Sequence, residues 1–142
     1  MLATQYAIRT GGAPSPRRIR KWVQAALSED AEITVRIVGA AEARALNRRF
    51  RGRDHATNVL TFVYEEGAWM RGDIALCAPV VAREARAQGK GVVAHYAHLV
   101  VHGVLHLQGY NHETEREARV MERRETQILR RMGYPDPYSG EA

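Results

Sequence analysis

Cysteine is nearly absent from this 142-residue chain, in which Cys77 stands alone. A single cysteine excludes an intramolecular disulfide and a zinc cluster built from cysteines, and we expect Cys77 to be a small core residue. No apolar run reaches the ~18 residues of a membrane span, and the first residues lack the basic-then-apolar pattern of a secretory signal. We therefore expect a cytoplasmic protein that does not act in a membrane.

Nothing in the composition indicates disorder, because hydrophobic residues make up 45% and charged residues 26% of the chain. The length suits a single domain spanning residues 1–142. Acidic residues are scarce in the first part: residues 1–54 hold 11 basic and 5 acidic side chains, within a net charge of +5 for the whole chain. This asymmetry is typical of proteins with a polyanionic partner, although a solvated basic surface would explain it equally well.

The spacing of apolar residues and of Gly and Pro predicts the secondary structure. Helices are expected from Ser15-Pro16 onward, over 40–50 with Leu46 and Phe50 facing inward, over 79–88, over 92–107, and after the capping box that begins at Thr114. Strands are expected over 32–37, 58–64 and 73–77, with the last two forming an antiparallel hairpin around a turn at 65–67. We predict an α+β fold in which a small mixed sheet of about four strands is covered by about five helices.

Five of the six histidines lie between residues 95 and 112. His102 and His106 are four residues apart, so on a helix they point to one side. Gly109 lets the chain leave the helix and fold back, which brings His112 towards the same point. Three neutral imidazoles with an open fourth position are typical of a catalytic zinc site, so we expect one Zn²⁺ per chain, although nickel or another ion that favours imidazole fits the same ligands. His98 is expected to touch substrate, to orient a ligand or to border the pocket.

The same segment, HGVLHLQGYNH, has the metzincin peptidase pattern H-E-x-x-H-x-x-G-x-x-H in all fixed positions but one. Gly103 stands where these peptidases have their glutamate general base. The pattern therefore predicts a metzincin-like zinc helix, while Gly103 argues against peptide hydrolysis.

The sequence also resembles the YbeY family of bacterial rRNA maturation endoribonucleases. HGVLHLQGYNH is similar to the family signature H-G-x-L-H-L-x-G-Y-D-H, and RGRDHATNVLTF at 51–62, RGDIALC at 71–77 and the ending around 133–138 resemble further family blocks. Asn111 departs from the usual Asp, and we expect this neutral side chain to tune the metal differently.

The resemblance implies a metal-dependent endoribonuclease that cuts single strands, acting in 16S rRNA 3′-end maturation and ribosome quality control. It implies that His102, His106 and His112 hold the metal and that Arg51 is functionally important. An arginine at that position suits the negative charge that builds on phosphoryl oxygens. The partners would be the 16S rRNA precursor and the ribosome or its small subunit, with Arg53, Asn58 and His98 as further substrate-binding candidates.

Two other functions stay open. The protein is alternatively a non-catalytic ribosome-assembly module with structural zinc, or a metzincin-like metallopeptidase. For the nuclease, the sequence leaves open which group accepts the proton and whether water or the ribose 2′-hydroxyl attacks.

Overall fold

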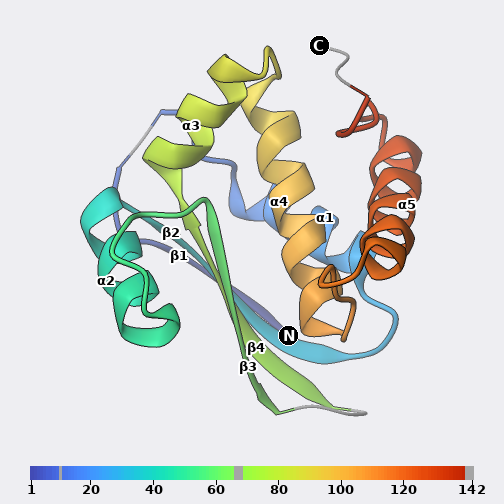
Figure 1. Ribbon diagram of the computed structural model, residues 1–142, viewed down its shortest axis with the longest axis horizontal. Helices are drawn as coiled ribbons and strands as arrows, with labels where there is room; N and C mark the ends of the chain where they lie inside the picture. Colours follow the sequence, from blue (N-terminus) through green and yellow to red (C-terminus); the bar gives the residue numbers. More distant parts are fainter. Residues whose placement is uncertain (10, 66–68, 140–142) are drawn as a thin grey trace.

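The structure, a computed structural model, describes residues 1–9, 11–65 and 69–139. Its centre is a mixed sheet with the strand order β1-β2-β4-β3 (Figure 1). β1 (Leu2–Tyr6), β2 (Ala31–Val38) and β4 (Met70–Cys77) run parallel to one another, and β3 (Val59–Glu65) is antiparallel to β4. β3 is therefore an edge strand, and the predicted β3–β4 pairing is confirmed.

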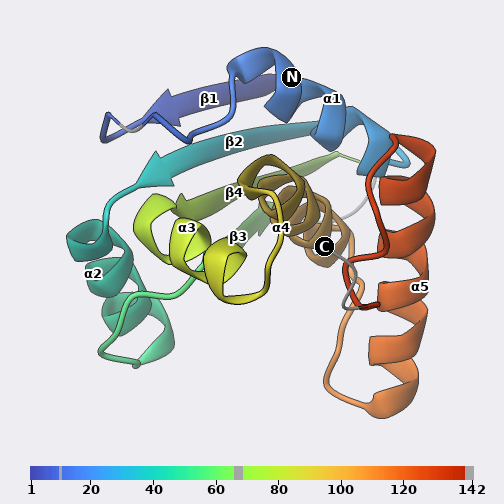
Figure 2. The same cartoon turned by 90° about the horizontal axis from the view of Figure 1, so that it is seen from above.

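Helices cover the sheet unequally. α1 (Pro16–Ala26) and α4 (Val92–Leu107) lie on one face, and α5 (Glu115–Arg131) packs outside α4. α2 (Ala40–Arg51) lies on the opposite face, and α3 (Ala78–Ala87) follows β4 directly and contacts α4 (Figures 1 and 2). The α+β class with four strands and five helices in the described residues confirms the prediction.

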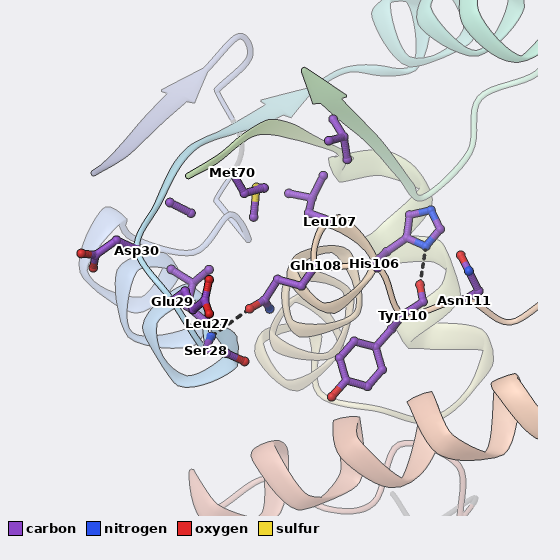
Figure 3. A pocket seen from close by; sticks show the side chains of 13 residues that line it. Leu27, Ser28, Glu29, Asp30, Met70, His106, Leu107, Gln108, Tyr110 and Asn111 are labelled. Carbon is purple, nitrogen blue, oxygen red and sulfur yellow. Dashed lines mark hydrogen bonds between the residues drawn. The ribbon is translucent and has the colours of Figure 1, made fainter. Parts of the chain in front are cut away.

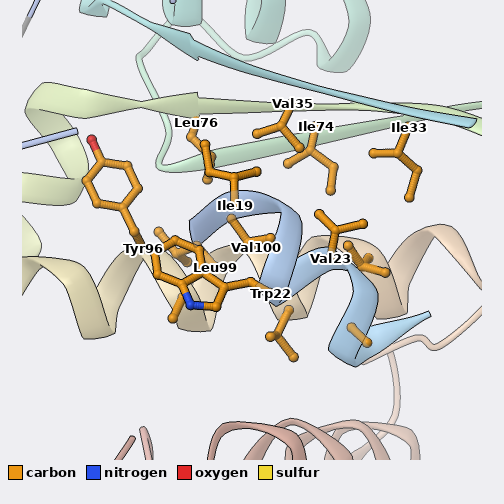
Figure 4. Close-up of a cluster of buried hydrophobic side chains, with 14 of the residues drawn as sticks. Ile19, Trp22, Val23, Ile33, Val35, Ile74, Leu76, Tyr96, Leu99 and Val100 are labelled. Atoms are coloured by element: carbon orange, nitrogen blue, oxygen red, sulfur yellow. The ribbon is translucent and has the colours of Figure 1, made fainter. Parts of the chain in front are cut away.

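The main hydrophobic core fills the space between the sheet and the α1–α4 layer (Figure 4). Trp22 of α1 and Tyr96 of α4 are its largest fully buried side chains, and they pack with Ile33 and Ile74 from the sheet. Burying a side chain of this kind contributes about 1.5–3 kcal/mol. This core holds α4 rigidly against the sheet, so it also fixes the position of the histidines on that helix.

Local signals explain where the helices begin. The Ser15 side chain accepts a hydrogen bond from the Arg18 backbone N–H, with Pro16 in the first turn. Thr114 and Glu117 form both bonds of the predicted capping box at the start of α5. Cys77 is buried, as predicted.

The structure differs from the sequence prediction at Phe50 and at β1. Phe50 was predicted to face inward, but it is 49% exposed because no layer covers that side of α2's last turn; Ala43 and Asn47 are the buried residues of this helix. β1 was not identified at all from the sequence. The turn predicted at 65–67 lies largely outside the described residues.

Candidate metal centre and its surroundings

Two histidines lie one turn apart on α4, and a third follows the end of the helix. His102 and His106 share one face because they are four residues apart. Gly109 has φ +99°, a left-handed conformation that lets the chain turn back. The ring centroid of His112 consequently lies 5.5 Å from that of His102 and 5.9 Å from that of His106. The structure brings together the three imidazoles that the sequence singled out.

Hydrogen bonds orient two of these rings. His102 Nδ1 lies 2.8 Å from Glu125 Oε1, and His106 Nδ1 lies 3.0 Å from the Tyr110 carbonyl oxygen. A carboxylate and a carbonyl only accept hydrogen bonds, so each Nδ1 carries the proton. In the neutral imidazole, Nε2 then keeps its lone pair, which is the form that binds a metal.

The three side chains fit zinc by donor type. Imidazoles bound to one tetrahedral zinc at about 2.0–2.1 Å have ring centroids about 5 Å apart, slightly closer than those of His112 to its neighbours. Within the described residues, no three His, Cys, Asp or Glu side chains already converge to ligand spacing. His112, the third of the histidines, is exposed on the loop that follows α4.

A buried carboxylate lies behind the histidines. Glu125 of α5 is fully buried, and besides His102 it contacts His98 Nε2 at 3.3 Å and the Tyr138 hydroxyl. Burial alone would raise the pKa of Glu125, but the hydrogen bonds from His102, His98 and Tyr138 lower it to about 2. The carboxylate therefore stays ionised at neutral pH, and it ties α4, α5 and the segment after α5 together.

Glu125 and Tyr138 were not singled out as functional residues from the sequence. The available signal was a glutamate at a position that the spacing of Met121, Ile128 and Leu129 places on the inner face of α5. A charged residue on such a face needs a partner. Its partner is 23 positions away on α4, which the sequence alone does not show.

The other histidine of α4 has a different environment. His95 Nε2 lies 2.9 Å from Glu84 Oε1, and Glu84 also accepts a hydrogen bond of 3.0 Å from Asn58 Nδ2. Asn58, predicted to bind substrate, thus uses its amide to join β3 to α3. Arg53, another substrate-binding candidate, is exposed in the loop after α2. His98, the third, directs its Nε2 at Glu125 and Tyr138.

Gly103 lets α4 approach the sheet closely. A Cβ at this position would lie 3.1 and 3.3 Å from side-chain carbons of Ile74 and 3.4 Å from Thr61 Cγ2. Ile74 is fully buried and has little room to move. A side chain at position 103, such as the glutamate of metzincin peptidases, would crowd Ile74 and require it to shift.

Arg51 ends α2 and lies across the free edge of β3. Its Nη2 donates a 2.6 Å hydrogen bond to the Thr61 carbonyl, and its guanidinium carbon lies 5.2 Å from the Phe62 ring centroid. Arg51 also acts on the predicted ligand His106: burial is the main reason that the pKa of His106 is lowered, and the positive charge of Arg51 adds to this effect. The structure therefore places Arg51 within electrostatic reach of the histidines.

A cavity of about 650 Å³ opens beside His106 (Figure 3). It lies between the loop that follows α1 and the end of α4, where Gln108 accepts a 2.8 Å hydrogen bond from the Ser28 backbone N–H. Val63 of β3 lines the same cavity. One of the three histidines, His106, therefore borders a substantial open space.

Comparisons with known proteins agree with one another. Residues 12–133 match the sequence model of a family described as Endoribonuclease YbeY. A protein of that name from Nitrosomonas eutropha is 57% identical over 137 residues, covering 96% of this chain and 97% of the relative. Another, from Aromatoleum aromaticum, is 59% identical over 127 residues, covering 89% of this chain and 82% of the relative.

A solved structure has the same fold. The solution structure of TM1509 from Thermotoga maritima matches with a TM-score of 0.66 and 26% identity, and the match covers 100% of both chains. The family match, the relatives and this structure support one conclusion, which the sequence resemblance had predicted. The chain belongs to the YbeY family of endoribonucleases.

Proposed function

We propose that this protein is a zinc-dependent endoribonuclease that cuts single-stranded RNA, with one Zn²⁺ held by His102, His106 and His112. The observation that supports the proposal is that hydrogen bonds orient two of these rings. His102 Nδ1 donates to Glu125, and His106 Nδ1 donates to a backbone carbonyl. Bound zinc supplies Lewis acidity and lowers the pKa of a water molecule to about 7. The membership of the chain in an endoribonuclease family supports RNA as the substrate.

Arg51 is proposed to stabilise the charge of the phosphoryl group. Its guanidinium is planar and always charged, and it matches the geometry of phosphate oxygens. In the structure its Nη atoms donate to two backbone carbonyls, those of Thr61 and Phe50. These neutral acceptors leave the positive charge of Arg51 without a carboxylate partner in the described residues, so a phosphate can compete for it.

Two observations count against the peptidase alternative. Gly103 provides no general base, and a side chain at this position would crowd Ile74. In addition, Arg51 occupies the Thr61 carbonyl on the free edge of β3. An extended peptide that adds to a sheet edge needs such carbonyls as hydrogen-bond acceptors.

The proposed biological role is 16S rRNA 3′-end maturation and ribosome quality control, in the cytoplasm and together with the ribosome or its small subunit. In the described residues, no helix has the length and apolar character needed to cross a membrane. The excess of basic residues in the first part of the chain supports a polyanionic partner.

The variant Arg51→Ala tests the catalytic proposal against the non-catalytic module. We expect it to lose cleavage of a 16S rRNA 3′-end fragment by about 10²-fold or more, as when a donor that stabilises transition-state charge is removed, while it keeps one zinc per chain. The matched control is Arg48→Ala, an exposed arginine on the same helix. Equal cleavage by wild type and Arg51→Ala would contradict the catalytic role of Arg51. Wild type that carries its zinc and binds small subunits but never cuts RNA would favour the module.

A further inference from the structure

A second open space adjoins the histidines on the other side of β3. This β3 groove has a volume of about 610 Å³, and its lining includes Phe50 of α2, Phe62 and Tyr64 of β3, Asp73 of β4, and His106. Residues of α2 and β3 line it, and Figure 1 shows that α2 covers only part of its face of the sheet. His106, one of the three proposed metal ligands, borders the groove.

Aromatic rings and arginines are paired along the β3 groove. Arg49 lies over Phe50 and Arg51 over Phe62, each with its guanidinium carbon 5.2 Å from the ring centroid, while Arg71 lies 5.7 Å from that of Tyr64. Phe50 and Phe62 meet edge to face at 5.2 Å. Three arginine–ring pairs side by side combine flat apolar surface with fixed positive charge.

Two of the three rings are open to solvent, and Phe62 between them is half-buried. Phe50 is 49% exposed and Tyr64 is 56% exposed. Large exposed aromatic side chains gathered in one place are typical of binding sites. Phe50 lies on the outward side of α2 and is not part of the hydrophobic core that the described residues form.

The charges of the β3 groove favour an anion. One of its two carboxylates, Glu42, is neutralised by Arg36 at 2.6 Å, whereas Asp73 keeps its negative charge and accepts a 2.7 Å hydrogen bond from the Tyr64 hydroxyl. Arg49 and Arg51 in the lining outnumber this one carboxylate. Arg49, by contrast, has no carboxylate within ion-pair distance in the parts of the chain that the structure describes. The net result is a positive rim around exposed rings.

We propose that the β3 groove binds single-stranded RNA, with bases stacked on Phe50, Phe62 and Tyr64 and phosphates facing Arg49 and Arg51. A strand bound in this way leads around the edge of β3 to His106. Stacking on protein rings requires bases whose faces are free, which a duplex does not offer. This inference rests on the proposed function and deepens it, because it gives a physical basis for the choice of single strands.

Binding of a fluorescent single-stranded 2′-O-methyl RNA, measured by anisotropy and checked to be intact afterwards, tests the β3 groove without depending on cleavage. Base stacking contributes roughly 5- to 150-fold in affinity per base. We therefore expect the double variant Phe50→Leu/Phe62→Leu to bind at least about tenfold more weakly, and Tyr64→Leu, at an exposed position that tolerates change, about fivefold more weakly. The matched control Tyr6→Leu alters an exposed ring on β1 outside the groove and should bind like wild type.

Duplex RNA of the same sequence is the second arm of the experiment. The proposal predicts that ring variants bind the duplex as wild type does, because only backbone contacts remain there. An equal loss of affinity for single strand and duplex would overturn stacking and would mean that charge is the only source of binding. Unchanged single-strand affinity in the ring variants would overturn the groove as an RNA site and would point to a protein partner.

The cleavage assay on the same preparations separates this inference from the proposed function. Wild type that binds single strands through the rings but cuts nothing would uphold the β3 groove and contradict the nuclease. Wild type that cuts RNA while the ring variants bind normally would contradict the groove only.

Discussion

Replacing Glu125 by glutamine removes the charge behind the proposed zinc ligand His102 and keeps the shape of the side chain. In the wild type, the carboxylate accepts hydrogen bonds from His102 Nδ1, His98 and Tyr138 in a fully buried position. The glutamine carbonyl can still accept the bond from His102. The amide nitrogen of the glutamine, however, donates hydrogen bonds at a position where the carboxylate oxygen accepted one. Part of the hydrogen-bond network around position 125 is therefore lost.

The size of the effect follows from the charge. A hydrogen bond to an ionised acceptor is roughly twice as strong as a neutral one, and it raises the basicity of the imidazole that binds the metal. Loss of such a partner typically weakens metal affinity by about 10- to 100-fold, or about 1.4–2.7 kcal/mol. We expect Glu125→Gln to retain the fold and to bind zinc more weakly within this range.

The assay is a zinc titration of metal-stripped protein in competition with a fluorescent chelator. Glu115→Gln is the matched control, because it makes the same change on the same helix at a side chain that is 94% exposed. A zinc affinity of Glu125→Gln within twofold of wild type, with an unchanged melting temperature, would refute the reasoning that His102 is a ligand supported by Glu125.

Three further predictions concern stability. Gly103→Ala should lower the urea midpoint, because overpacking against Ile74 costs ~1–3 kcal/mol and outweighs the ~1 kcal/mol gained in helix propensity; a higher midpoint would contradict the close approach of α4. Thr114→Ala should cost about 1 kcal/mol through loss of the capping box, whereas Thr114→Ser should cost little; equal midpoints of the two variants would be inconsistent with the cap. Burial lowers the pKa of His95 below its ordinary 6.5, against the opposing hydrogen bond with Glu84. The unfolded state therefore takes up a proton at His95 more readily than the folded state, so the free energy of unfolding falls as the pH drops below 6.5. His95→Gln should make this decline smaller, as measured by denaturant titrations between about pH 7.5 and 5.5.

Elements with local signals were predictable from the sequence. Ser15-Pro16 and the Thr114–Glu117 box mark helix starts by their own hydrogen bonds, and α4 was predicted with its observed bounds because Gly91 and Gly109 flank a continuous apolar run. The spacing of His102, His106 and His112 likewise depends only on helix geometry and one glycine.

Features that depend on distant partners were not predictable in this way. β1 lacks a clear alternation of apolar and polar residues, and it is a strand because it pairs with β2, some thirty residues away, as the Leu2–Ile33 register shows. Phe50 fits the apolar pattern of α2, yet it is exposed, because the pattern does not tell whether another layer faces it. The hydrogen bond between Glu125 and His102 also joins two helices whose packing no local pattern specifies.

The most direct test of the central claim couples metal content to cleavage in wild type and in His106→Ala, prepared side by side. Bound zinc is quantified in both, and both are assayed on a 16S rRNA 3′-end fragment. The account predicts one zinc per chain and cleavage in wild type, with both lost in His106→Ala. Zinc in wild type together with equal cleavage in both preparations would contradict it, since the RNA would then be cut by something other than the site formed by His102, His106 and His112.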